Sequence, residues 1–117
     1  MDLSDIMQQK TFLIVGNTRN KEKYAYQIKQ AMIEHGYQVY DADSVQTMSD
    51  VPDALDVIDL CIRADRGLEI LQACEKKVSC VVIQPGASSE ALVGYLDSKQ
   101  IPYIHGCLLE GLRLYRN

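Results

Sequence analysis

Short apolar runs alternate along this chain with segments in which apolar residues recur at helical spacing. Three of the runs, at 11–15, 57–62 and 78–83, are nearly continuous and rich in β-branched residues. Runs of this length and composition are typical of parallel strands that are buried on both faces. Weaker runs of the same kind lie at 38–42 and 102–104. Together these runs predict a sheet of five strands.

The segments between the runs predict helices. Tyr24, Ile28 and Met32 share one face of a helix that Asn20 can cap and Gly36 can end. Further helices are expected at 3–9, 68–74 and 91–96, the last of them opened by Ser88 or Ser89.

Regular alternation of strands and helices predicts the fold class. It is typical of an α/β, three-layer, doubly wound Rossmann-like fold, with a mostly parallel five-stranded sheet and helices on both faces. The 117 residues are enough for one compact domain and too few for two, and no repeat or linker divides them. We therefore expect residues 1–117 to form a single domain.

Charge and hydropathy exclude several classes of function. A net charge of -4 disfavours a nucleic-acid-binding surface, which needs clustered Lys and Arg to neutralise phosphates. The first residues do not combine a basic segment with an apolar one, and no apolar stretch approaches the length of a membrane span. We expect a cytoplasmic protein that binds neither nucleic acid nor membranes.

The four cysteines give no sign of a disulfide framework or a metal site. They lie far apart, without a Cys-x-x-Cys pair or a histidine at zinc-ligand spacing. Cys61 and Cys80 fall inside apolar runs and are expected to be small buried hydrophobic residues. Cys107 is not assigned in this way.

The first apolar run ends in a polar loop that has the composition of an anion site. In doubly wound sheets, ligands bind beyond the carboxyl ends of the strands, where the strand order reverses. Gly16 allows a sharp turn and a close approach, and the following helix presents unpaired N–H groups with a partial positive charge. Asn17, Thr18, Arg19 and Lys23 add polar groups and cations. A plain turn with solvated charges stays open, because the full glycine fingerprint of dinucleotide binders is absent.

Two further loops should reach the same edge of the sheet. Arg63 could meet a phosphate or an adenine there, or could pair instead with Asp65 or Asp59. Pro85 and Gly86 lead into the start of another helix, which can bind an anion or a carbonyl group. An ordinary capped turn is the alternative for this last segment.

These loops carry a resemblance to a known family. The stretch VGNTRNKEKYA resembles the phosphate loop of small CoA-binding proteins of Rossmann type, which are related to the CoA-binding domain of the succinyl-CoA synthetase α subunit. Gly16, Thr18 and Lys23 take the places of the glycine, serine and lysine of that family's loop. The likeness covers nearly the whole chain and continues through VIDL at 57–60 and QPGA at 84–87 to Cys107.

The resemblance implies a non-catalytic protein that binds CoA or an acyl-CoA through its pyrophosphate. The implied binding residues are Gly16, Asn17, Thr18, Arg19, Lys23, Arg63, Pro85 and Gly86. No catalytic residue is assigned, because no Ser-His-Asp order or carboxylate pair is recognisable. His105 and Cys107 could place an imidazole beside a thiol, whereas His35 is expected to cap a helix.

An acidic segment at 41–50 keeps other functions open. Asp41 or Asp43, at the end of the second strand, would suit a free ribose hydroxyl, as in NAD binders, and would repel the 3′-phosphate of CoA. Either side chain could instead point into solvent. An NAD- or adenine-nucleotide-binding sensor or redox domain remains an alternative, as does an interaction domain that has lost its ligand. Edge strands and tyrosines leave a homodimer open.

Overall fold

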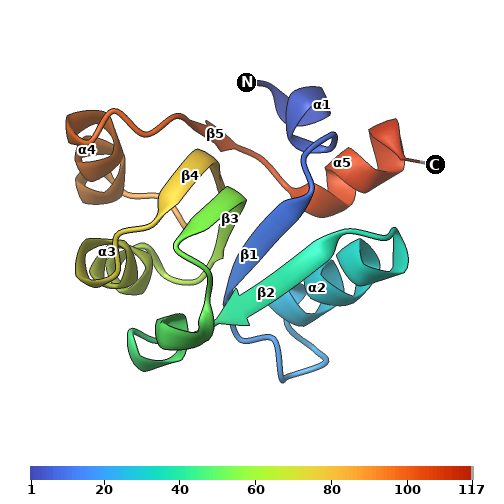
Figure 1. Ribbon diagram of the computed structural model, residues 1–117, viewed down its shortest axis with the longest axis horizontal. Helices are drawn as coiled ribbons and strands as arrows, with labels where there is room; N and C mark the ends of the chain where they lie inside the picture. Colours follow the sequence, from blue (N-terminus) through green and yellow to red (C-terminus); the bar gives the residue numbers. More distant parts are fainter. Residues whose placement is uncertain (117) are drawn as a thin grey trace.

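Parallel strands form the centre of the molecule. In the computed structural model, which describes residues 1–116, five strands lie in the order β2-β1-β3-β4-β5 (Figure 1). Their bounds are β1 Thr11–Gly16, β2 Gln38–Ala42, β3 Ala54–Cys61, β4 Lys77–Ile83 and β5 Tyr103–His105. Each neighbouring pair is parallel, which confirms the predicted α/β, doubly wound, Rossmann-like fold.

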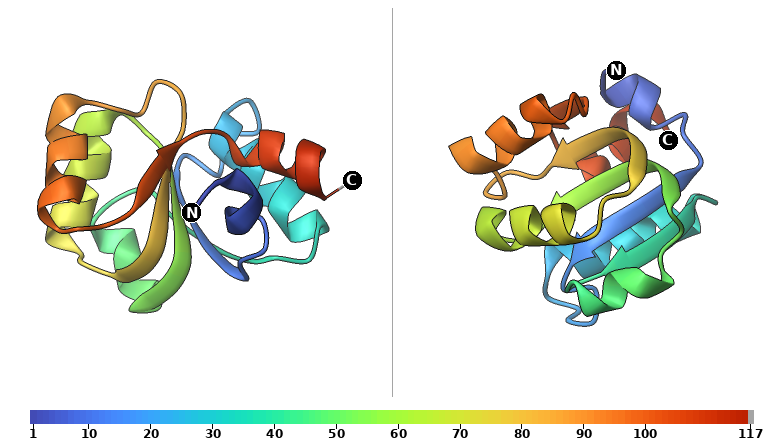
Figure 2. Two further views of the ribbon diagram at one scale, coloured as in Figure 1. Left: turned by 90° about the horizontal axis from the view of Figure 1, so that it is seen from above. Right: turned by 60° about the vertical axis from the view of Figure 1, so that its left-hand side comes forward.

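Helices cover both faces of this sheet. The helical elements are α1 Leu3–Ile6, α2 Tyr24–Glu34, the 3₁₀ helix η1 Gln46–Asp50, α3 Ala64–Ala73, α4 Glu90–Ser98 and α5 Leu108–Tyr115. Figure 2 shows the sheet nearly edge-on, with α3 and α4 on one side and α1, α2 and α5 on the other. The three predicted layers are therefore present.

The alternation of side chains along the strands divides the core in two. Leu13 and Leu60 belong to the cluster under α3 and α4, whereas Ile14 and Val57 belong to the cluster under α2 and α5. All four side chains are fully buried. Burial on both faces explains why these strands read as continuous apolar runs instead of alternating ones.

Two helix ends confirm the sequence-based predictions and one corrects them. Gly36, with a φ of 87°, follows the end of α2, and the Ser89 hydroxyl accepts a hydrogen bond from the Leu92 N–H at the start of α4. The predicted cap at Asn20 is wrong, because α2 begins only at Tyr24. The Asn20 side chain accepts from the Glu22 N–H instead, so the chain completes a turn before the helix starts.

The pattern of apolar residues did not predict α5 or η1. In α5, Leu108 and Leu112 are buried in the cluster under α2, so this helix completes the cover of one face of the sheet. Its Gly111 permits close packing on α1, because a Cβ there would lie 2.5 Å from the Met7 sulfur.

Candidate functional site

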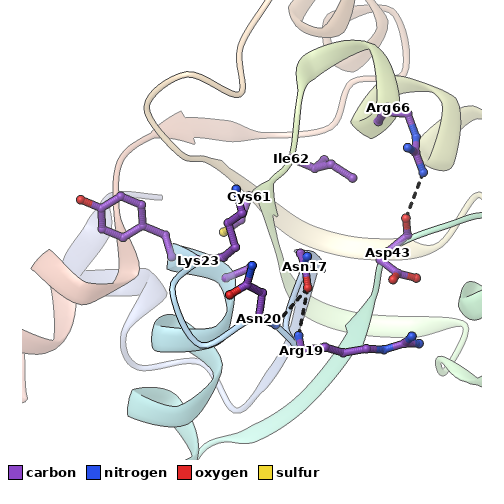
Figure 3. Close-up of a pocket in the computed structure, with 10 residues that line it drawn as sticks. Asn17, Arg19, Asn20, Lys23, Asp43, Cys61, Ile62 and Arg66 are labelled. Atoms are coloured by element: carbon purple, nitrogen blue, oxygen red, sulfur yellow. Dashed lines mark hydrogen bonds between the residues drawn. The ribbon is translucent and has the colours of Figure 1, made fainter.

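The strand order reverses between β1 and β3, and a cleft opens at the carboxyl ends of these strands. Gly16 and Cys61 are register partners there, and the chain leaves them toward α2 on one face and α3 on the other. The cleft measures about 730 Å³ and is shown in Figure 3. We call it the charged cleft because its lining includes Arg19, Lys23, Arg66 and Asp43. This is the position at which doubly wound sheets bind ligands.

The loop after β1 is shaped by Asn17. Its side-chain oxygen accepts hydrogen bonds from the backbone N–H groups of Arg19 and Asn20, each at 3.1 Å, as Figure 3 shows. The Lys23 N–H then donates to the Asn20 carbonyl at 3.0 Å. These bonds fold the loop so that Arg19 and Lys23 both line the charged cleft.

The N-terminus of α2 lies in the wall of the same cleft. Lys23, Tyr24 and Ala25 line it, and they are the N-cap and first two residues of the helix. The N-cap provides no side-chain hydrogen bond, and the first turn carries no acidic residue. The first N–H groups of the helix therefore lack a side-chain acceptor, and their partial positive charge adds to that of the loop cations.

A second cavity adjoins the cleft and has a different character. It measures about 430 Å³ and shares Tyr24, Cys61 and Ile62 with the charged cleft. Its other lining residues are Arg63, Gln84, Pro85, Gly86, Ala87 and Cys107. We call it the apolar pocket, because Arg63 is its one charged residue among those that the structure describes. A ligand that crosses from one cavity to the other would pass Tyr24, which is 69% exposed.

A tight turn forms one wall of the apolar pocket. The Ala87 N–H donates to the Gln84 carbonyl at 2.9 Å, with Pro85 and Gly86 at the two central positions. Gly86 has a φ of 88°, which a glycine adopts without strain at the third position of such a turn. The turn places Pro85 and Gly86 beside the apolar pocket. The start of α4 lies further along the chain, where the Ser89 hydroxyl accepts a hydrogen bond from the helix.

A comparison with known protein families shows which family this chain belongs to. The sequence model of a family described as a CoA binding domain matches residues 10–112. This chain belongs to the CoA-binding-domain family. A search among curated proteins found no match.

Solved structures show the same fold as this CoA-binding domain. A conserved hypothetical protein from Pyrococcus furiosus aligns with a TM-score of 0.74 and 23% identity, over 86% of this chain and 97% of its own. Prb, the PH1109 protein redesigned for binding, gives 0.81 and 19%, over 97% and 89%. The Thermus thermophilus protein named cell-free ID.343 gives 0.75 and 18%, over 97% and 98%.

Gly16 is packed closely between β3 and α2 of this CoA-binding domain. A Cβ at this position would come within 2.5 Å of the Cys61 carbonyl oxygen and 3.0 Å of the Ala25 Cβ. The close approach that requires a glycine here is therefore an approach of β1 to β3 and α2. Its role toward a ligand stays a prediction.

Thr18 has its hydroxyl turned toward the second strand. The side chain is 8% exposed, and its hydroxyl donates to the carboxylate of Asp41, which also accepts from Lys29 Nζ at 3.1 Å. Partial burial acts to raise the pKa of Asp41, but these hydrogen bonds and the charges of Lys29 and Arg19 hold it below its ordinary value. The carboxylate of Asp41 is thus engaged with protein groups. Thr18 lies beside the charged cleft and is not among the described residues that line it.

Arg66 is a cationic residue of the charged cleft that was not predicted from the sequence. It lies in the first turn of α3, and its guanidinium donates to the Asp43 carbonyl oxygen at 3.2 Å (Figure 3). It faces the charged cleft together with Arg19 and Lys23. The predicted helix began at residue 68, which left Arg66 in a loop. The sequence does contain a signal for it, because Arg66 follows Arg63 by three residues, which is the spacing of neighbours on one helix face.

Arg63 forms one of the pairs that the sequence left open. Its guanidinium lies 3.3 Å from the Asp65 carboxylate, with both side chains more than 70% exposed. Exposed pairs of this kind contribute little to stability, so Arg63 can exchange Asp65 for another anion. Asp59, the other candidate partner, is fully buried.

A buried carboxyl group lies next to Cys61. Asp59 sits in β3 between Ile14 and Val82 in register, and burial raises its pKa to about 7. The Cys61 thiol donates to Asp59 Oδ2 at 3.1 Å. Burial, Asp59 and Cys107 together raise the pKa of this thiol. The prediction that Cys61 is an ordinary buried residue is wrong, because it is only partly buried and lines both cavities.

Of the remaining histidines and cysteines, all of which the structure describes, only Cys107 lines one of the two cavities. His105 Nε2 lies 3.0 Å from the Ser88 hydroxyl, whereas Cys107 is the N-cap of α5 and lines the apolar pocket. His35 caps α2 as predicted, with Nδ1 2.8 Å from the Ala31 carbonyl oxygen. Cys80 is fully buried, as expected.

Within residues 1–116, no group of three or more His, Cys, Asp or Glu side chains is placed to bind a metal ion. In the same part of the chain, every helix is too short or too polar to span a bilayer.

Proposed function

We propose that this protein binds CoA, or an acyl-CoA, without catalysing a reaction. The observation that carries the proposal is the contact between two cavities of opposite character at the strand reversal. The cleft of about 730 Å³ is charged, and the adjoining pocket of about 430 Å³ is mainly apolar. CoA has a matching division, because a phosphorylated adenosine diphosphate continues into a long uncharged pantetheine arm. Membership of the CoA-binding-domain family supports the same ligand.

The charged cleft fits the diphosphate of this ligand. Arg19 and Lys23 reach it from one loop, and Arg66 reaches it from the other side of the sheet. The uncapped start of α2 adds backbone donors. Hydrogen bonds to charged groups contribute about 1.5–3 kcal/mol each, so the cleft offers a binding energy that a single surface cation does not.

The apolar pocket fits the pantetheine arm. Its volume of about 430 Å³ lies within the range of about 300–1,000 Å³ that small-molecule sites occupy. Pro85 and Ile62 provide apolar contacts, and Gln84 provides a polar group. An arm that enters here from the diphosphate passes Cys61 and Ile62, where the two cavities meet, and extends toward Cys107.

One observation favours a second candidate, NAD or another adenine dinucleotide. Asp43 lines the charged cleft, and one of its carboxylate oxygens accepts from the Thr47 hydroxyl at 3.2 Å. A carboxylate at the end of the second strand suits the ribose hydroxyls of NAD. It would weaken, through repulsion, the binding of a 3′-phosphate placed next to it.

Titration calorimetry with CoA, dephospho-CoA, NAD and ATP separates these candidates. We expect CoA and dephospho-CoA to bind more tightly than NAD and ATP, because only the first two carry the pantetheine arm. The melting temperature should rise with the bound ligand, since a concentration 100 times the Kd stabilises the folded state by about 2.7 kcal/mol. Tighter binding of NAD would favour the second candidate. No stabilisation by any of the four would favour an interaction domain without a nucleotide ligand.

A further inference from the structure

Gln84 carries a buried acceptor without a partner in the apolar pocket. The residue is 7% exposed, and its Oε1 is one of two buried side-chain atoms within residues 1–116 that lack a hydrogen-bond partner. The other is Oδ1 of Asp59. An unsatisfied buried polar group of this kind costs about 1–3 kcal/mol. Gln84 also lines the apolar pocket, so a ligand there lies against this residue, whose Oε1 is buried in the free protein.

Hydrogen bonds to its neighbours hold the main chain of Gln84 in place. Its N–H donates to the Leu60 carbonyl at 3.1 Å, and its own carbonyl accepts from Ala87. Its side chain lies near the Cys61 thiol and acts to lower the pKa of that thiol, against the larger effect of burial. The Cys61 thiol in turn donates to Asp59. Oε1 of Gln84 takes part in none of these hydrogen bonds and is left for another donor.

The chemistry of the pocket defines that donor. A neutral carbonyl oxygen in an apolar wall attracts an N–H or O–H group and repels an anion. An ammonium group is disfavoured, because it would lose its water and would lie near the cationic Arg63 at the same pocket. A neutral secondary amide offers an N–H donor without a charge, and the pantetheine arm of CoA contains two such amides.

We propose that Gln84 Oε1 accepts a hydrogen bond from an amide N–H of the pantetheine arm and so selects ligands with an amide-bearing arm. This inference rests on the proposed function, because it assigns a specificity-determining residue to the same site. Binding then satisfies an acceptor that stays unpaired in the free protein. A site that hydrogen-bonds its ligand discriminates strongly against analogues that lack the donor, since the buried acceptor is left unpaired again.

The first test replaces Gln84 by methionine, which has a similar length and no acceptor of this strength. Wild type and Gln84→Met are titrated with CoA and with adenosine 3′-phosphate 5′-diphosphate, which lacks the arm. We expect CoA to bind about five- to tenfold more weakly to the variant, because one hydrogen bond is lost. The affinity for the arm-less nucleotide should stay within twofold. Equal affinity of CoA for both proteins, or an equal loss for both ligands, would overturn the inference while the proposed function stands.

A thermal melt of the unliganded proteins distinguishes a glutamine that binds the ligand from one that stabilises the fold. Removal of an unsatisfied buried acceptor should leave the melting temperature of Gln84→Met unchanged or raised. A structural glutamine would lower it on replacement. A lowered melting temperature together with unchanged CoA affinity would therefore contradict the assignment.

A ligand-side experiment tests the same bond in the wild-type protein. The two amides of the pantetheine arm are replaced by esters, one at a time, which removes an N–H and keeps the length of the arm. One of the two analogues should bind about five- to tenfold more weakly than CoA. Analogues that both bind as CoA does would overturn the inference. If CoA itself does not bind, the proposed function fails and the role of Gln84 fails with it.

Discussion

At the scale of single residues, position in the loop after β1 decides what a cation can do. Lys23 and Lys21 are both exposed and two residues apart. Lys23 lines the charged cleft, whereas Lys21 is not among the described residues that line it. The two lysines therefore form a matched pair with the same charge and different access to a ligand.

Replacement of Lys23 by alanine should weaken CoA binding about tenfold, because a charge-assisted hydrogen bond contributes about 1.5–3 kcal/mol. Lys21→Ala should change the affinity less than twofold. Titration calorimetry at one salt concentration measures both effects, and thermal melts check that both variants fold. Equal effects of the two substitutions would mean that the cation acts through general charge and that the loop assignment is wrong.

The buried carboxyl group of Asp59 should make the stability of the protein depend on pH. Its pKa rises from 3.8 to about 7 on folding, so the folded state keeps a proton that the unfolded state releases. Its contribution to stability is thus fully present below about pH 4 and is lost as the pH rises to 7. This rise in pKa corresponds to a loss of about 4 kcal/mol in the free energy of unfolding over this pH range.

The variant Asp59→Asn should lack this fall in stability, because its side chain has no proton to release. Urea unfolding at several pH values between 4 and 8 gives the free energy of unfolding for both proteins. Wild type should lose stability relative to the variant as the pH rises over this range. Parallel curves for the two proteins would show that Asp59 does not titrate as its burial requires.

The sequence predicted which loops form the site better than which side chains face it. Arg19 and Lys23 line the charged cleft, but the Thr18 hydroxyl is bonded to Asp41. That bond joins residues 23 positions apart in the chain. No local pattern contains such a contact, and the direction of a loop side chain depends on it.

At the scale of elements, α5 shows what a short amphipathic helix contributes. It contains eight residues, and Leu112 on its inner face is 4% exposed, whereas Leu114 on its outer face is 50% exposed. The sequence did not predict this helix, because its interior glycine and its lack of a capping side chain remove the usual signals. Tertiary packing on the face under α2 stabilises it instead.

Leucine-to-alanine substitutions in α5 should separate its two faces. Leu112→Ala should lower the free energy of unfolding by about 2–4 kcal/mol, since it removes a buried side chain and leaves a cavity. Leu114→Ala should change it by less than about 0.5 kcal/mol. Urea unfolding measures both values. A comparable loss at Leu114 would indicate that the outer face of α5 is covered in solution.

At the scale of the whole molecule, the order of the strands connects the fold to the function. Because β1 lies between β2 and β3, the chain leaves its first strand in one direction and returns on the other side. The two cavities lie at this reversal and meet at Cys61 and Ile62. The fold and this position could be predicted from the alternation of apolar runs and helices. The meeting of the loops at this edge could be predicted as well, whereas the apolar character of the pocket could not, because it depends on which of their side chains face inward.

A crystal structure of the protein grown with CoA tests the central claim most directly. We predict that the diphosphate lies in the charged cleft at the start of α2, within hydrogen-bond distance of Lys23, and that the pantetheine arm passes Tyr24 into the apolar pocket. Empty cavities in such crystals, or CoA bound at another surface, would contradict the account.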